Sequence, residues 1–147
     1  MSLPHWTRTL WPLPVTALGL CLAACARLSG ARWCLRKGVV EVCGGRVGAA
    51  FNRLGGRHCI EAMTLGHVVL ARDARTLRRW RRHEHVHVRQ YERWGIGFLP
   101  AYGLSSLWQW SRGRCPYRDN RFERAAYQLS HPGRESTQAG SSSESMP

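Results

Sequence analysis

The chain has 147 residues, 44% of them hydrophobic, and a net charge of +13 at pH 7, with 22 Lys and Arg residues against 9 Asp and Glu. This hydrophobic fraction excludes disorder over the whole chain and is enough for one domain with a core. The positive charge attracts anionic lipid or nucleic acid. We interpret the charge as a general preference for Arg in the composition, balanced by anionic lipid, in preference to a dedicated nucleic-acid-binding surface.

Residues 9–26 contain no charged side chain. The segment is at the short end of what a membrane-spanning helix requires, and we expect a retained membrane anchor within residues 1–37. Basic residues follow the segment, which places the rest of the chain in the cytoplasm. Two alternatives stay open: a cleaved signal or lipoprotein signal, because residues 22–25 resemble a lipobox, and a helix buried in the folded domain.

Six cysteines are spread along the chain without any C-x-x-C pair: Cys21, Cys25, Cys34, Cys43, Cys59 and Cys115. This spacing does not match a zinc ribbon. An even number permits disulfides outside the cytoplasm but does not establish them. We expect these cysteines to be mostly buried small apolar residues.

From Gly38 the pattern is that of a folded domain, which we place at residues 38–129. Residues 38–43 alternate as a short strand before the turn signal at 44–45, and residues 47–54 form a short helical piece. Residues 62–71 are apolar and β-branched, which predicts one strand that is bulged or kinked at Gly66.

The clearest element is a helix over residues 73–94, which contains no Gly or Pro and is followed by Gly95 as a C-cap. Asp73 or Thr76 can cap its N-terminus. Glu84 and His87 share one face of this helix with a set of apolar side chains: Leu77, Trp80, Tyr91 and Trp94.

Three elements follow that helix. Residues 98–110 are mostly apolar and uncharged but too short to span a bilayer comfortably, so we expect a core helix or a membrane-surface helix. A loop at 113–117 precedes a last helix, which starts at 119–120 and extends through Tyr127. Residues 130–147 are rich in Ser, Gly and Gln and predict a disordered tail.

The run His83-Glu84-His85-Val86-His87 matches the H-E-x-x-H motif. Residues four apart on a helix lie one turn above each other, so His83 and His87 can bind one metal ion. Glu84 can then serve as general base on a water whose pKa zinc lowers to about 7. The competing interpretation is a solvated arginine-rich helix. His85 points elsewhere and is not an expected ligand.

Two imidazoles leave zinc short of the three protein ligands usual in a catalytic site. Glu92 projects away from His87 on the helix, so Asp119 and Glu123 remain as acidic candidates at the start of the last helix. Glu123 can be the third ligand. Asn120 and Glu123 also fit the two ends of a capping box, so both roles stay open.

Three stretches, residues 64–70, 83–93 and 117–127, resemble small bacterial zincin-like proteins and are similar to minimal gluzincin metallopeptidases. The resemblance covers about residues 62–128. It implies a strand before the H-E-x-x-H helix, an edge strand able to hold extended peptide, and a later helix that supplies a glutamate ligand.

The same resemblance implies roles for individual residues: His83, His87 and Glu123 as zinc ligands and Glu84 as the base. The chain departs from the family pattern at two positions. Position 121 is Arg where a proline is expected, and position 125 is Ala where a second acidic residue is expected.

We therefore predict an α+β domain with a small β-sheet, an H-E-x-x-H helix, an apolar helix and a glutamate helix, preceded by a membrane segment. The expected function is that of a membrane-associated Zn²⁺ metallopeptidase acting on a peptide or protein substrate. One alternative is a catalytically inactive zincin-like membrane protein that binds a metal or a protein partner. Another is nucleic-acid binding through residues 78–82, for which Trp80 is the single aromatic residue.

Overall fold

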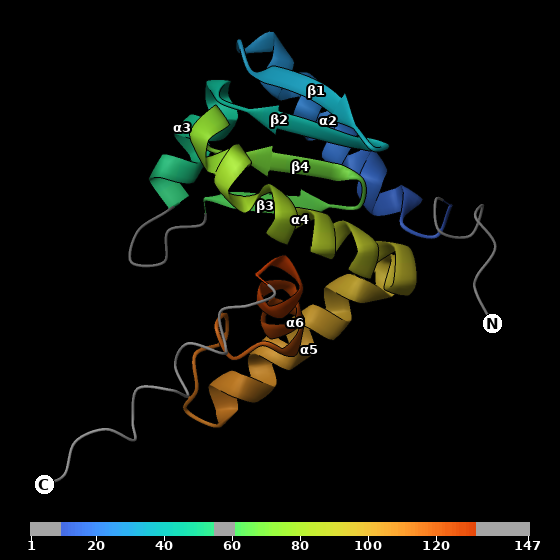
Figure 1. Cartoon of the computed structure of the whole chain (residues 1–147), viewed down its shortest axis with the longest axis vertical. Helices are drawn as coiled ribbons and strands as arrows, with labels where there is room; N and C mark the ends of the chain where they lie inside the picture. The colour runs from blue at the N-terminus through green and yellow to red at the C-terminus, as the bar shows by residue number, and fades with distance from the viewer. Residues whose placement is uncertain (1–9, 55–60, 132–147) are drawn as a thin grey trace, which may run out of the picture.

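The computed structural model describes residues 10–54 and 61–131, which form an α+β fold around a four-stranded mixed sheet (Figure 1). Helix α2 (Leu13–Leu28) covers one face of the sheet and helix α4 (Ala74–Trp94) covers the other. The predicted fold class is confirmed for the sheet and for the helices that follow it.

The strand order is β1-β2-β4-β3. Strands β1 (Arg32–Arg36) and β2 (Val39–Cys43) form an antiparallel hairpin, and β3 (Ala62–Leu65) and β4 (Val68–Ala71) form another. The central strands β2 and β4 run parallel. Strand β3 is therefore an edge strand, paired on one side only, and it lies against α4.

Strand β4 is buried at every position because both of its faces are covered. Val68 and Leu70 pack in a core cluster with α2, whereas Val69 and Ala71 pack in a second cluster with α4. This alternation follows from the two-residue period of a strand. These contacts fix the position of α4 against the sheet.

Residues 62–71 form two strands and not the single strand that the sequence suggested. Gly66 has φ +60°, a conformation that glycine adopts easily, and the chain reverses there. Strand β1 was not predicted, because all five of its residues are exposed and it shows no alternation of polar and apolar side chains. The predicted boundary at residues 37/38 falls in the turn between β1 and β2.

The uncharged N-terminal segment forms α2, a helix of 16 residues. Val15, Gly19, Ala23 and Ala26 point inward. The approach to the sheet is close, since a Cβ at Gly19 would lie 2.8 Å from the Cβ of Val68. Within residues 10–54 and 61–131, no helix combines the length and apolar character that crossing a bilayer demands. The expected spanning anchor is therefore not found there, and its orientation stays a prediction.

Helix α4 begins and ends where its capping residues predict. The Asp73 carboxylate accepts a 2.8 Å hydrogen bond from the Thr76 backbone N–H, so Asp73 is the N-cap. At the other end Gly95 has φ +57° and donates its backbone N–H to the Tyr91 carbonyl. The two caps define a rigid helix that carries the H-E-x-x-H motif in its middle turns.

The remaining helices are α3 (Gly45–Leu54), the short 3₁₀ segment η1 (Gly95–Gly97), α5 (Phe98–Ser111) and α6 (Arg121–Ser130). Helix α6 packs against α4, and α5 packs against α6 (Figure 1). A shared core cluster joins these helices to α2: Val15, Tyr91, Phe98 and Phe122. The predicted disordered tail lies outside the described residues, apart from Ser130 and His131.

The expectation of mostly buried cysteines is wrong for three of the five that the structure describes. Cys43 is buried, but Cys21, Cys25 and Cys34 are exposed because they lie on the outer side of α2 and on the edge strand β1. All five have free thiols, and Cys59 lies outside the described residues.

Candidate metal centre

His83 and His87 lie one turn apart on α4 and point to the same place, where Glu123 of α6 meets them. The Nε2 atoms of the two imidazoles are 3.1 Å apart. Glu123 Oε2 lies 3.1 Å from His83 Nε2, and Glu123 Oε1 lies 3.3 Å from His87 Nε2. All three residues are buried, and their possible ligand atoms lie within 4.8 Å of one another.

The donor set and its spacing fit a zinc ion. In a tetrahedral site with Zn–N distances of about 2.0–2.1 Å, two ligand nitrogens lie about 3.3 Å apart. The His83–His87 separation of 3.1 Å is close to that value. Two imidazoles and one carboxylate are also a common set of protein ligands for catalytic zinc. The described residues therefore contain a buried group that could hold a metal ion.

Gln90 determines which nitrogen of His87 is free. The Gln90 side chain donates its Nε2–H to the Phe122 carbonyl at 3.0 Å, which leaves Oε1 facing His87 Nδ1 at 2.8 Å. An amide oxygen accepts only, so Nδ1 carries a proton, and when Nε2 gives up its own proton it can present a lone pair to a metal ion at the centre. Gln90 thus orients one proposed ligand and ties α4 to the start of α6.

Glu84 lies beside this centre and is buried. Thr64 of β3 donates its hydroxyl to Glu84 Oε2 at 2.6 Å. Burial raises the pKa of the Glu84 carboxyl, and the neighbouring imidazoles of His87 and His83 oppose the shift only in part. A carboxyl whose pKa moves toward neutrality is suited to accept and return a proton.

Glu123 is the ionised partner in the centre. Burial alone would raise its pKa, but hydrogen bonds from His83 and His87 outweigh burial and lower the pKa to about 2. For His87 the balance is similar: burial alone would lower its pKa, yet the Glu123 carboxylate raises the pKa above 6.5. Tyr102 of α5 adds a 2.8 Å hydrogen bond from its hydroxyl to Glu123 Oε1.

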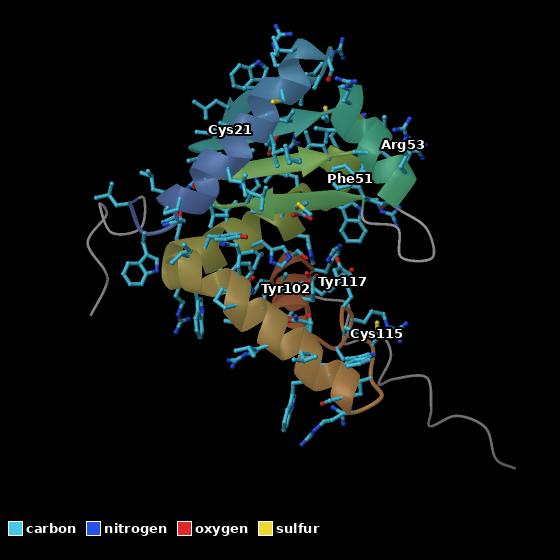
Figure 2. All side chains as sticks on the ribbon, turned by 180° about the vertical axis from the view of Figure 1, so that it is seen from behind. Cys21, Phe51, Arg53, Tyr102, Cys115 and Tyr117 are labelled. Atoms are coloured by element: carbon cyan, nitrogen blue, oxygen red, sulfur yellow. The ribbon has the colours of Figure 1, made fainter. Side chains whose placement is uncertain are left out.

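Aromatic rings enclose the imidazoles. The Tyr127 ring of α6 lies 4.6 Å from the His83 ring, and the Trp80 ring of α4 lies 5.6 Å from it, centroid to centroid. In Figure 2, Tyr102 of α5 and Tyr117 of the loop before α6 lie side by side below the sheet. This wall lowers the local dielectric around the centre and strengthens its electrostatic interactions.

The structure assigns the cap of α6 to Asn120 and leaves the Glu123 carboxylate free of a capping role. Asn120 is the N-cap of α6, since its side-chain oxygen accepts a 2.9 Å hydrogen bond from the Phe122 backbone N–H. The Glu123 carboxylate instead bonds the two histidines and Tyr102. At the positions that depart from the family pattern, Arg121 is exposed and Ala125 is half-buried.

His85 lies on another side of α4 and takes no part in the centre. Its Nε2 lies 2.9 Å from Glu41 Oε1, and Arg81 also bonds the Glu41 carboxylate, at 2.9 Å. Glu41 comes from β2 and its side chain is fully buried. This cluster holds α4 on the sheet and so fixes the helix that carries His83 and His87.

Three residues of the site were not assigned from the sequence: Thr64, Gln90 and Tyr102. Gln90 could have been identified from the sequence, because it follows His87 by three positions and residues at that spacing are neighbours on a helix. Thr64 and Tyr102 reach the centre only through the packing of β3 and α5, which no local pattern reveals.

No family model, curated protein or solved structure matches this chain. The likeness to minimal gluzincins therefore stays a resemblance carried by the residues themselves.

Proposed function

We propose that the chain is a zinc-dependent peptidase whose centre consists of His83, His87 and Glu123, with Glu84 as general base. The observation that carries the proposal is the convergence of three buried ligand groups within 4.8 Å of one another, beside a buried carboxyl. Burying such polar groups is costly unless they are paired or bind a metal. Hydrogen bonds among the three side chains offset part of this cost, and a cation bound between their ligand atoms would offset the rest.

A bound zinc ion would supply an acidified water and polarise the carbonyl of the scissile bond. Glu84 accepts the proton of the attacking water and later delivers it to the leaving amine. The Thr64 hydroxyl holds the Glu84 carboxylate in one orientation during this exchange. Gln90 keeps the His87 imidazole aimed at the centre through its contact with Nδ1.

Strand β3 is suited to hold the substrate. It is an edge strand, and its free side carries backbone N–H and C=O groups that can pair with an extended peptide. Thr64 lies within this strand and bonds Glu84, so a peptide added to β3 would run close to the proposed base. The proposed substrate class is an extended peptide or an unfolded segment of a protein.

A second candidate is a protein of the same fold that binds metal without catalysis. Imidazoles that bind a metal usually donate their other ring nitrogen to an acceptor, but His83 Nδ1 is buried without a partner among the described residues. Ala125 also removes a carboxyl that the family pattern provides. Both features leave the proposed metal ligands with fewer supporting contacts, which favours this second candidate.

Substitution at Glu84 tests the proposal. The zinc-loaded full chain is incubated with a broad peptide mixture, and cleavage is followed by mass spectrometry. We expect Glu84→Gln to bind zinc but to abolish cleavage, whereas Glu92→Gln, on the same helix, retains it. Cleavage by Glu84→Gln at the parent rate would show that Glu84 is not the base. A parent chain that binds zinc but cleaves no peptide would favour the second candidate.

A further inference from the structure

The outer side of α2 is apolar, and no other part of residues 10–54 and 61–131 covers it. A helix that is hydrophobic all round is normally buried in a protein core or in a membrane. Only one side of α2 meets the sheet, and the other side exposes large apolar residues to the surroundings: Leu13, Leu18, Leu20, Leu22 and Leu28. Arg27, in the last turn, is the single charged residue of this helix.

Helix α5 has a similar outer side. The helix contains no charged residue, and only Phe98 of its residues is fully buried. Its exposed apolar side chains are large and include two tryptophans: Leu99, Leu104, Leu107, Trp108 and Trp110. Exposed apolar surface of this extent marks an interaction site.

Helices α2 and α5 lie on the same side of the molecule. In Figure 2, α2 lies in front of the sheet and α5 lies in front of α6, and Cys21 marks the viewer's side of α2. Figure 1 shows both helices from the opposite side, behind the sheet and behind α6. Segment η1 contacts both helices, Trp11 packs on Gly95 of this segment, and Ile96 is 56% exposed.

We use the name α2–α5 face for the exposed large apolar side chains of α2, η1 and α5, of which the last helix also borders the start of α6: Leu18, Leu20, Leu22, Ile96, Leu104, Leu107 and Trp108. Its surroundings are cationic. Every acidic side chain in the described part of the chain is buried or half-buried, whereas Arg27, Arg93 and Arg112 are exposed near the ends of the two helices. The Arg112 guanidinium lies 4.3 Å from the Trp108 ring centroid.

We propose that the α2–α5 face inserts into the headgroup–acyl boundary of a bilayer that contains anionic lipid. Interfacial helices bury leucines at this depth, place tryptophans at headgroup level and keep arginines against anionic phosphates. The exposed charge of the chain complements such a surface, and each arginine near it adds attraction. The helices lie in the interface and need not cross it, which agrees with their lengths.

The proposal is independent of the zinc chemistry and is tested with vesicles. Full-length protein is sedimented with phosphatidylcholine vesicles that contain or lack phosphatidylglycerol, at low and high salt. We expect binding to the anionic vesicles that weakens in high salt. Brominated lipid should quench tryptophan fluorescence, since Trp108 lies at the boundary.

Two double variants locate the bound surface. Leu18→Glu with Leu22→Glu changes α2, and Leu104→Glu with Leu107→Glu changes α5; these leucines are 42–67% exposed, so the fold is retained. Each pair should weaken vesicle binding about tenfold or more. Leu129→Glu is the control, since Leu129 is 63% exposed but belongs to α6.

Three results would overturn the proposal. The parent chain could remain unbound to both kinds of vesicle. Alternatively, binding could persist at the parent level in both double variants. Finally, sedimentation without lipid could show a dimer that both double variants dissociate, with no vesicle binding, in which case the α2–α5 face joins two copies of the chain.

Discussion

Thr64 of the edge strand β3 donates a 2.6 Å hydrogen bond to the Glu84 carboxylate of α4. The same hydroxyl lies 3.3 Å from the Glu84 backbone carbonyl, so strand and helix are linked at the proposed base. The strand proposed to hold the peptide therefore also sets the orientation of the group proposed to act on it.

Replacing Thr64 by Val removes the hydroxyl and keeps the shape of the side chain. We expect zinc binding to be retained and kcat to fall roughly 10- to 100-fold, because the base loses the contact that orients it. Thr64→Ser keeps the hydroxyl and should restore most of the rate. The measurement is kcat on a cleaved peptide, and an unchanged kcat in Thr64→Val would show that this bond does not position the base.

Gln90 provides the second prediction. Gln90→Leu removes both the acceptor for His87 Nδ1 and the donor to the Phe122 carbonyl, so zinc affinity should fall about 10- to 100-fold. Gln90→Glu keeps an acceptor for His87 and should lose less. Zinc titration by calorimetry measures both. Equal affinities in the parent and in Gln90→Leu would contradict the assigned role.

The third prediction separates a ligand from a cap. Glu123→Ala removes a proposed ligand and should weaken zinc binding by orders of magnitude. Asn120→Ala removes the cap of α6 and should lower the free energy of unfolding by about 1–3 kcal/mol while leaving zinc affinity near the parent value. Unchanged zinc affinity in Glu123→Ala would assign Glu123 to the structure of α6 alone.

The fourth prediction concerns acid stability. Burial alone would raise the pKa of Glu41, but hydrogen bonds from Arg81 and His85 outweigh it and hold the pKa below 4.5 in the folded chain. The unfolded chain therefore binds this proton more readily. The resulting stabilisation is present above the unfolded pKa and is lost as the pH falls through the folded pKa.

Chemical denaturation of the metal-free chain, with a chelator present, measures this effect. Arg81→Leu should lower the free energy of unfolding by about 2–4 kcal/mol at neutral pH, because the buried Glu41 carboxylate loses its main partner. The deficit should shrink as the pH falls below 4.5. Glu92→Gln, which breaks a half-buried pair with His67, is the control and should change stability little.

Elements with strong local signals were predictable from the sequence. The spacing of His83, Glu84 and His87 requires only a helix, and the segment between Asp73 and Gly95 carries both capping signals and no helix breaker. The edge strand β1 gave no such signal, because an exposed strand needs no apolar alternation. The turn at Gly66 was missed because apolar residues flank it on both sides, which is also the pattern of one long strand.

The site was predictable to the extent that one helix determines it. His83 and His87 are related by the period of α4, but the position of Glu123 depends on how α6 docks on α4. The sequence left two roles open for Glu123, because residues 120–123 also matched a capping box that begins at Asn120. Only the packing of Phe122 and Tyr102 shows that the carboxylate of Glu123 turns inward.

Zinc content tests the central claim most directly. Purified parent chain and His85→Ala, which changes a histidine of the same helix outside the centre, should each hold about one zinc per chain. The double variant His83→Ala with His87→Ala should hold none while keeping its helical content. Stoichiometric zinc in that double variant, or no zinc uptake by the parent, would contradict a metal centre at this site.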